Sequence, residues 1–412
     1  MKKVIMKRSI LIALSGALIM TSSINMNSFA QSDLVYNGTC YEAVIDDVYY
    51  KLNETQGYVT AKLKNEKLTE ITVRGSMDDY PVRSFHTYGG AQHVKVLNIS
   101  TGIEDVDISD CNELVELNIS STVKEIDISY CPNLAECNVD KENEIFSSDD
   151  GVVYDKSGKT LFYYPSGKPD KVYIIPEGVE EIGSSDEYNN IVAIDSCKYL
   201  EDIVFPDSLK RVNGRAVVNN NFEYLEFPTN VTSLDSCSFA ENKKLKEVVI
   251  HENLLNGSYA TFDNCDSLEK AVFLRTDKFN DNYYKESLSA STIIFPDCYG
   301  YGVIFGDELY QHKSNVYDMT IYVPDSNYEN YQYAMGNIEH YTFVPLSERE
   351  KSEPGDVNMN GRVEIHDIIG IQKYFVNRRC AGGLDMDVNG DENVNIVDLL
   401  MTKQYVSDAY SE

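Results

Sequence analysis

The sequence contains no tryptophan, and its 412 residues include only 36 lysines and arginines against 66 aspartates and glutamates. The formal charge of −30 repels phosphate backbones and anionic lipid surfaces, so nucleic-acid binding is not expected. No segment beyond the first 30 residues is apolar over the roughly 20 residues that a membrane-spanning helix needs. Membrane insertion of the mature chain is therefore not expected either.

Recognisable catalytic motifs are also missing. The sequence has no His-Glu-x-x-His motif, no Gly-x-Ser-x-Gly turn and no glycine-rich phosphate loop, and its six histidines are scattered. Hydrolysis of a glycosidic bond needs two facing carboxylates, but 66 acidic residues contain many pairs by chance, so no pair can be assigned from the sequence. These absences favour a protein that is not an enzyme.

The first 30 residues have the order of a secretory signal peptide. A positive start precedes an apolar run, Ser9–Met20, which is too short to cross a bilayer, and Ser28-Phe29-Ala30 offers small residues at a cleavage position. We expect cleavage before Gln31 and a mature charge near −34, because the leader has four positive and no negative residues. An uncleaved N-terminal anchor is the alternative. The positive residues are Lys2, Lys3, Lys7 and Arg8.

The nine cysteines are an odd number for a secreted chain. Four of them stand three residues before a leucine, as in Cys111-Asn-Glu-Leu114, which marks a recurring position. Because cysteine is among the most buried residue types, this recurrence favours a ladder of buried thiols, with a disulfide framework as the alternative. The four are Cys111, Cys131, Cys197 and Cys265.

Internal repeats are the main signal in the body of the chain. Residues 97–116 and 117–136 align without a gap at a period of 20, and each contains two short runs of alternating apolar and polar residues. That alternation predicts strands. Longer units follow, marked by Pro176, Pro206 and Pro228, with spacings of 30 and 22. One such unit cannot bury its own apolar face, so the repeats predict a stacked, β-rich solenoid.

These repeats resemble the BspA-type (Treponema-type) leucine-rich repeats of bacterial surface and secreted proteins. The resemblance covers about residues 44–345 and implies an N-terminal cap over 31–96 and a solenoid over 97–345. It is specific for the fold and does not identify a ligand. Three segments outside the regular repeats agree: a cap at 47–52 and 80–82, an inserted hairpin at 150–168 and a closing unit at 321–331.

The chain has 30 tyrosines, which are open to two interpretations. Exposed tyrosines on a sheet can stack on sugars or anchor a protein partner. Buried tyrosines would fill the repeat core with the hydroxyl at the rim, and we favour this interpretation for any single tyrosine. Tyr328, Tyr331 and Tyr333 are expected to pack the closing unit.

A polar linker over 346–355 leads into a segment with calcium-loop spacing. Six to eight oxygen ligands suit Ca²⁺, and Gly361 at loop position 6 permits the sharp turn. A second copy follows at an offset of 31, with Glu392 at the position of the glycine, which predicts a weaker second site. The predicted ligands of the first ion are Asp356, Asn358, Asn360, Arg362 (through its carbonyl), Glu364 and Asp367. Those of the second ion are Asp387, Asn389, Asp391, Asn393, Asn395 and Asp398.

Each loop is predicted to lead into a helix, with Val363 and Val394 packing inward at loop position 8. Apolar residues recur at helical spacing after each loop. Pro354 leaves no room for a full helix before the first loop, so the arrangement is loop-helix, linker, loop-helix. The apolar positions are Ile368, Ile371 and Phe375 in the first copy and Leu399, Leu400 and Tyr405 in the second.

This duplicated loop-helix, with Asp at both positions 12, resembles a type I-like dockerin over residues 356–408. The resemblance implies calcium-dependent binding to a cohesin module of a scaffoldin, and hence a place in a cellulosome. The two copies are only roughly symmetric, so cohesin binding in two orientations remains open. The alternative to a dockerin is a calcium module that merely stiffens this end of the chain. The resemblance implies cohesin contacts at Ile365, His366, Gln372 and Lys373 in the first copy and Ile396, Val397, Lys403 and Gln404 in the second.

Together these patterns predict a secreted, non-catalytic cellulosome component that displays a leucine-rich-repeat solenoid and binds two Ca²⁺ ions in its small α-helical dockerin. The expected ligand of the solenoid is a protein or a plant polysaccharide. A polysaccharide-degrading enzyme is the serious alternative, because dockerin-bearing proteins usually have that activity, and a protease-inhibitor-like module is another.

Overall fold

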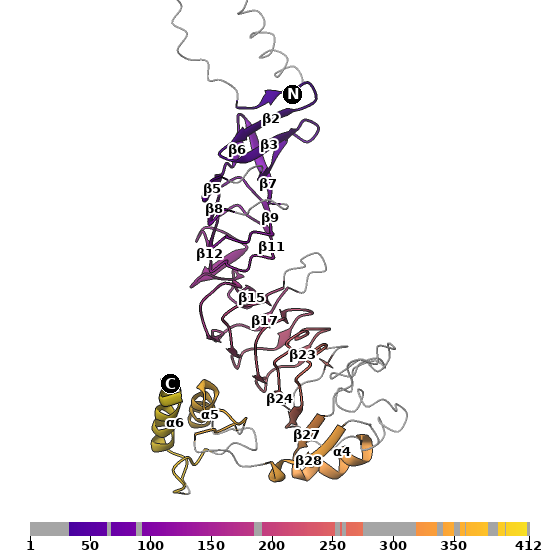
Figure 1. Cartoon of the computed structure of the whole chain (residues 1–412), viewed down its shortest axis with the longest axis vertical. Helices are drawn as coiled ribbons and strands as arrows, with labels where there is room; N and C mark the ends of the chain where they lie inside the picture. Colours follow the sequence, from indigo (N-terminus) through magenta and orange to yellow (C-terminus); the bar gives the residue numbers. More distant parts are fainter. Residues whose placement is uncertain are drawn as a thin grey trace, which may run out of the picture.

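The protein is an elongated stack of short strands followed by a small pair of helices (Figure 1). This computed structural model describes residues 33–63, 67–87, 93–184, 192–251, 256–257, 261–274, 319–335, 341–349, 355–358, 360–377, 386–391 and 393–409. The predicted signal peptide, 1–30, lies outside the described residues. We call the described residues 33–345 the repeat body and the described residues 355–409 the C-terminal module.

The repeat body begins with an antiparallel meander. Strands β1 to β4 pair in sequence, and β4 then pairs in parallel with β7. This change from antiparallel to parallel pairing joins the meander to the repeats. The strands are β1 (Val35–Tyr36), β2 (Tyr41–Ile45), β3 (Val48–Asn53), β4 (Tyr58–Leu63), β6 (Ser76–Met77) and β7 (Tyr80–His86).

Two parallel ladders form the first block of repeats. In one of them Leu117 lies opposite Leu97 and Cys137, so neighbouring strands are related by the 20-residue period of the sequence. This ladder also includes β5, which precedes the predicted start of the solenoid at residue 97. Parallel pairing of the repeat type therefore begins before that residue. One ladder contains β5 (Glu70–Val73), β8 (Val96–Ile99), β10 (Glu116–Ile119) and β12 (Glu136–Val139); the other contains β7, β9 (Asp105–Ser109) and β11 (Glu125–Ser129).

Polar side chains also stack between the repeats of this block. Asn118 Nδ2 donates to Asn98 Oδ1 at 2.8 Å, and Asn138 Nδ2 donates to Asn118 Oδ1 at 3.1 Å. The alternating apolar residues point inward, as the strand period requires. Where two turns meet, a Cβ on Gly75 would lie 1.6 Å from the carbonyl oxygen of Thr101, so only glycine allows this approach.

The predicted hairpin is present and leads into the second block of repeats. Strands β13 (Phe146–Asp149), β14 (Val152–Asp155) and β15 (Thr160–Tyr163) pair antiparallel, and β15 continues as a parallel ladder. That ladder contains β17 (Glu181–Ile182), β20 (Arg211–Val212), β23 (Ser233–Leu234) and β25 (Asn256–Gly257). Beside it lie β16 (Val172–Ile174) with β19 (Asp202–Val204), β18 (Ile194–Asp195) with β21 (Val217–Val218), and the sheet of β22 (Tyr224–Glu226), β24 (Glu247–Ile250), β26 (Lys270–Phe273), β27 (Met319–Val323) and β28 (Tyr341–Pro345).

The predicted thiol ladder lies inside this stack. Cys111, Cys131, Cys197 and Cys265 are all at most 2% exposed. All seven cysteines in the described part of the chain are free thiols. Burial raises the pKa of Cys265 to about 12, which keeps this thiol protonated. In this part of the chain the recurring cysteines therefore act as small core residues.

Two buried asparagines, Asn220 and Asn242, continue this line between Cys197 and Cys265. Asn242 Oδ1 accepts the N–H of Asn220 at 2.9 Å, and its Nδ2 donates to the carbonyls of Val217 and Phe239 at 3.0 and 2.7 Å. Asn242 is fully buried. The side chain therefore satisfies backbone groups of two neighbouring repeats that water does not reach.

Replacing Asn242 with alanine should destabilise the repeat body by about 3 kcal/mol, because it leaves buried backbone groups without partners. The measurement is urea unfolding followed by far-UV circular dichroism. Asn230→Ala is the control, since Asn230 is exposed and makes one hydrogen bond, to the carbonyl of Asp207. Equal destabilisation by the two variants would contradict a ladder role for Asn242.

The repeat body is closed by the predicted C-terminal unit. Tyr331 of α4 (Tyr328–Met335) is 1% exposed, and its ring centroid lies 6.5 Å from that of Phe273 and 5.9 Å from that of Phe343. Tyr331 therefore packs the end of the core, as predicted. The short helix η1 (Asp325–Asn327) precedes α4. The side chain of Tyr333 lies outside the described part.

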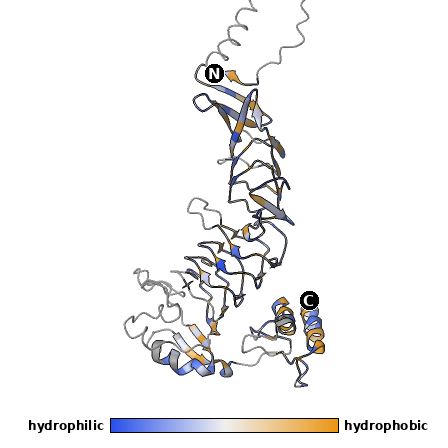
Figure 2. Ribbon diagram, turned by 180° about the vertical axis from the view of Figure 1, so that it is seen from behind, coloured by the Kyte–Doolittle hydropathy of each residue, from blue (hydrophilic) through white to orange (hydrophobic). Residues whose placement is uncertain are grey.

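The C-terminal module consists of two helices, α5 (Ile365–Asn377) and α6 (Ile396–Ala409). Its small core contains Val357, Ile371, Met386 and Leu399 and is separate from the cores of the repeat body. Apolar positions lie on both helices and along the strands of the body (Figure 2). No helix in the described ranges is long and apolar enough to span a membrane.

The chain folds back between the body and the module, so that α5 and α6 lie beside the second block of repeats (Figure 1). The first part of the predicted linker, 346–355, packs on the body. Helix η2 (Leu346–Glu348) lies against a small apolar cluster, and the guanidinium of Arg349 pairs with the buried carboxylate of Glu247. These contacts anchor the chain before the module begins.

Candidate functional site

The first predicted calcium loop is folded around the carboxylate of Asp367. This residue is fully buried and accepts backbone N–H groups from Val357, Asn358 and Glu364 at 2.7, 3.1 and 2.7 Å. The carboxylate of Asp356 accepts the N–H of Asn360 and of Gly361 at 3.0 and 2.7 Å. The first and last predicted ligands of the loop thus organise its backbone.

The second loop repeats this arrangement at the offset of 31. Asp398 is fully buried and accepts the N–H of Asn389 and Asn395 at 3.2 and 2.7 Å, as Asp367 does with Asn358 and Glu364. Asp391 N donates to Asp387 Oδ1 at 3.0 Å, the counterpart of the bond from Asn360 to Asp356. The duplication seen in the sequence is therefore also a duplication of loop geometry.

The loops fit a hard cation. Their side-chain donors are carboxylate and amide oxygens, the ligands that calcium prefers. Burial and, to a smaller extent, the charges of Asp356 and Glu364 raise the pKa of Asp367 to about 7, against backbone hydrogen bonds that lower it. A divalent cation between these oxygens would compensate that crowding of negative charge.

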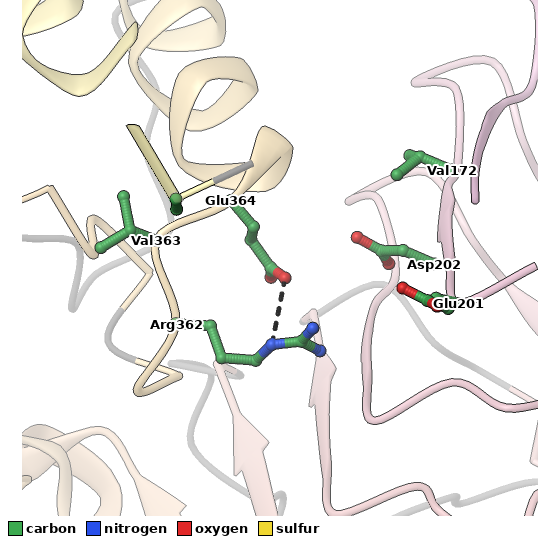
Figure 3. A pocket seen from close by; sticks show the side chains of 7 residues that line it. Val172, Glu201, Asp202, Arg362, Val363 and Glu364 are labelled. Atoms are coloured by element: carbon green, nitrogen blue, oxygen red, sulfur yellow. Dashed lines mark ion pairs between the residues drawn. The ribbon is translucent and has the colours of Figure 1, made fainter. Parts of the chain in front are cut away.

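Gly361 has φ of +84°, as expected at loop position 6. Glu392, the predicted counterpart of this glycine, lies outside the described residues. Val394 packs against the module core, whereas Val363 is half-buried and lines a cavity (Figure 3).

Two of the apolar helix positions do not point into the module core. Phe375 is 38% exposed and Leu400 is 59% exposed. Both lie on the helix surface because the module core is small. Its buried positions on the two helices are occupied by Ile371 and Leu399. Helical spacing identified the helices correctly but did not distinguish a core stripe from an exposed apolar position.

The first copy packs on the repeat body. His366 is 7% exposed, its Nε2 lies 3.2 Å from the carbonyl oxygen of Ile203, and its ring meets that of Tyr224 edge-on at 5.5 Å. Arg362 Nη1 lies 3.9 Å from Glu223 Oε2. The loop of the first copy therefore rests on strands β19 and β22 of the second block.

A buried charged triad lies within this contact. His366 Nδ1 is 3.2 Å from Asp202 Oδ2 and 3.4 Å from Glu364 Oε1. Burial alone would lower the pKa of His366, but the two facing carboxylates outweigh this and raise that pKa well above its usual value. Figure 3 shows Asp202 on the body side and Glu364 on the module side of a cavity of about 250 Å³.

The structure places the eight predicted cohesin contacts in two different environments. In the first copy His366 is buried in the contact with the body, Ile365 is half-buried and Gln372 is exposed. The side chain of Lys373 lies outside the described part. In the second copy all four positions are exposed: Ile396, Val397, Lys403 and Gln404.

Sequence reasoning did not identify Asp202, Ile203 or Tyr224 as neighbours of the module. His366 and Ile203 are 163 residues apart, and Asp202 stands in an ordinary strand of a repeat. The only sequence signal was the polar Asp202 at a position that is buried in the structure. Such a residue is recognisable only once its partner is known.

Two family models match the chain. The BspA type leucine rich repeat region matches in six copies over residues 59–149 and 158–291, which together are more than half of the chain. The dockerin type I domain matches residues 354–407. No relative among curated proteins matches.

Several solved structures resemble the chain at low identity. The pneumococcal vaccine antigen PcpA is 16% identical, with a TM-score of 0.44, over 75% of this chain and 98% of that one. A leucine rich cell surface protein from Faecalibacterium prausnitzii is 17% identical, with a TM-score of 0.34, over 59% and 91%. A leucine-rich repeat protein from Bacteroides ovatus is 15% identical, with a TM-score of 0.30, over 73% and 99%.

The two family matches agree with the β-solenoid body and the two-helix module described above. A type I dockerin implies binding to a cohesin within a cellulosome-like complex, and a leucine-rich-repeat domain implies a binding role. Type I dockerins typically bind calcium. The chain belongs to the BspA-type leucine-rich-repeat family and carries a type I dockerin domain in residues 354–407.

Proposed function

We propose that this protein is a secreted, non-catalytic component of a cellulosome, attached by its dockerin to a cohesin of a scaffoldin and displaying the repeat body. The observation that carries the proposal is the pair of equivalent loop-helix units, each organised around a fully buried Asp at loop position 12. Export by the predicted signal peptide agrees with this extracellular role.

Two Ca²⁺ ions would hold the dockerin in its binding conformation. The oxygen ligands are the residues predicted from loop spacing, from Asp356 to Asp367 and from Asp387 to Asp398. The loops hold their carboxylates close together, so removal of calcium leaves repulsion that opposes folding of the module. Cohesin binding is therefore calcium-dependent.

The face offered to the cohesin is that of the second copy. Ile396, Val397 and Leu400 are 59%, 45% and 59% exposed and lie within one and a half turns of α6. An exposed apolar group of this kind, with Lys403 and Gln404 on the next turn, has the composition of a protein interface. The first copy is not equivalent, because its His366 is buried against the repeat body. A single binding orientation follows.

The repeat body would contact a protein or a plant polysaccharide. Its exposed tyrosines in the described part, Tyr36, Tyr130 and Tyr199, belong to different strands or turns, and they do not form one stacking platform. A polysaccharide-degrading enzyme and a protease-inhibitor-like module are the competing functions. Turnover of plant polysaccharide by the purified chain would establish the first, and specific inhibition of a protease the second.

The decisive experiment is calorimetry of the full chain against a panel of type I cohesins. We expect tight binding to at least one cohesin in calcium and loss of that binding, by a factor of about 100 or more, in excess chelator. A cohesin that fails to bind in calcium is uninformative alone, but failure of the whole panel would contradict the proposed attachment. The dockerin would then be a calcium module that only stiffens this segment.

A further inference from the structure

Three buried side-chain atoms that accept hydrogen bonds or bind metals converge where the dockerin meets the repeat body. They are Asp202 Oδ2 from β19, Glu364 Oε1 from the first loop and His366 Nδ1 from the start of α5. One possible ligand atom from each of the three residues lies within 4.8 Å of the other two. The three residues are 6%, 4% and 7% exposed. This grouping exists only because the dockerin packs on the body.

Hydrogen bonds orient two of these groups and direct their other polar atoms toward each other. His366 Nε2 lies 3.2 Å from the carbonyl oxygen of Ile203, which takes the Nε2–H and directs the other ring nitrogen toward the two carboxylates. Asp202 Oδ1 accepts the N–H of Ile203 at 2.8 Å. His366 Nδ1 and Asp202 Oδ2 face each other at 3.2 Å as an ion pair, but neither atom makes a hydrogen bond of regular geometry. Both are buried polar atoms aimed at the same point.

Two of the three ligand separations match the edge of a zinc coordination tetrahedron, and the third, between the two carboxylates, is at most 4.8 Å. Zinc–ligand bonds of roughly 2.0–2.1 Å place two tetrahedral ligand atoms about 3.3 Å apart. The separations from His366 Nδ1 to Asp202 Oδ2 and to Glu364 Oε1 are 3.2 and 3.4 Å. A ligating histidine that donates its other ring N–H to a backbone carbonyl is also the usual arrangement at such sites.

We propose that Asp202, Glu364 and His366 bind a divalent transition-metal ion of the zinc class, which clamps the dockerin to the repeat body. The imidazole nitrogen favours zinc over calcium, which prefers oxygen ligands only. The adjoining cavity of about 250 Å³ opens on Asp202 and Glu364 and has room for a water molecule as the fourth ligand (Figure 3).

The clamp is separate from the calcium loops but touches the first of them. Asn360 Nδ2 donates to Glu364 Oε1 at 2.6 Å, so the carboxylate of Glu364 lies between the loop and the proposed zinc site. Loop position 9 often reaches calcium through a water molecule, which leaves Glu364 free to bind a second cation. The zinc site depends neither on cohesin binding nor on the ligand of the repeat body.

The test begins with the full chain stripped of metal ions and then saturated with calcium, which fills the dockerin loops. This sample is titrated with Zn²⁺ and, separately, with Co²⁺. We expect one further ion per chain, with the visible absorption of tetrahedral cobalt. Asp202→Asn keeps the size of the side chain and should weaken zinc binding by about 100-fold or more, as should His366→Ala. His86→Ala is the matched control, because His86 Nδ1 faces Asp107 Oδ2 at 3.7 Å and, among the described residues, this pair is not part of a group of three possible metal ligands.

Stoichiometric zinc binding by the wild-type and by His86→Ala, lost in Asp202→Asn, supports the clamp. The absence of stoichiometric binding by the wild-type overturns it, and the contact is then an ion pair of protonated His366 with two carboxylates. Zinc binding that survives Asp202→Asn also overturns it, because the ion would then lie elsewhere. Calcium-dependent cohesin binding is measured on the same samples and distinguishes failure of the clamp from failure of the proposed attachment.

Discussion

Replacing Ile396 and Val397 with aspartate in the full chain should lower the affinity for a bound cohesin by about 100-fold or more, equivalent to about 2.7 kcal/mol. Both side chains are exposed at the start of α6, at 59% and 45%, where an apolar partner would cover them. A charge that is desolvated there without a partner opposes binding. The measurement is calorimetry in calcium.

The duplicated dockerin contains its own matched control. Ile365 stands at the same loop position in the first copy as Ile396 in the second, and the next residue, His366, is buried in the contact with the repeat body. Ile365→Asp should therefore change cohesin affinity by less than about threefold, provided that circular dichroism shows an intact module. Ile396→Asp is its single-residue counterpart.

The comparison separates three arrangements. Loss of binding in the second copy alone confirms the single orientation. Loss in the first copy alone means that the cohesin displaces the repeat body from His366, and our assignment of the face is then wrong. Binding that survives either change and fails only when both are combined indicates two usable orientations, which would mean that the contact with the body is weak.

Replacing Asp367 with alanine should abolish calcium binding in the first loop and reduce cohesin affinity by about 100-fold or more. Asp367 is fully buried and accepts three backbone N–H groups, so its loss removes both a calcium ligand and the organiser of the loop. Removal of calcium from the wild-type should have a similar effect on the module. Melting followed by circular dichroism, with calcium and with chelator, gives the readout.

The repeat body should be unaffected by this change. Its two large apolar clusters contain no residue of the dockerin, whose own core is formed by Val357, Ile371, Met386 and Leu399. Asp408→Asn is the control, because Asp408 is exposed and lies outside both loops. If Asp367→Ala retains normal cohesin affinity in calcium, the first loop is not required for attachment.

Much of the architecture followed from patterns that are local in the sequence. The 20-residue period places Leu117 beside Leu97 and Cys137, and strand alternation then decides which side chains enter the core. The recurring cysteines, including Cys111 and Cys265, are buried because they occupy the same inward position in the repeats that contain them. Repetition makes such inferences robust, since each unit packs on a neighbour of the same kind.

The two calcium loops could also be predicted from local sequence. Ligand spacing within a calcium loop is a property of about twelve consecutive residues, so Asp356, Gly361 and Asp367 could be assigned to their positions without any long-range information. The helices that follow were identified by apolar spacing. The exposure of Phe375 and Leu400 was not, because it depends on how large a core two short helices can enclose.

The sequence by itself therefore determined the solenoid, the duplicated loops and the residue types that suit calcium, since each of these depends on neighbours within one or two repeats. Only the tertiary structure decided that the first dockerin copy packs on the repeat body while the second copy is exposed. The chain folds back after β28 and brings His366 to Asp202 and Ile203, which are more than 160 residues away. Contacts at that separation depend on how the whole stack of repeats is built, and no local pattern records them.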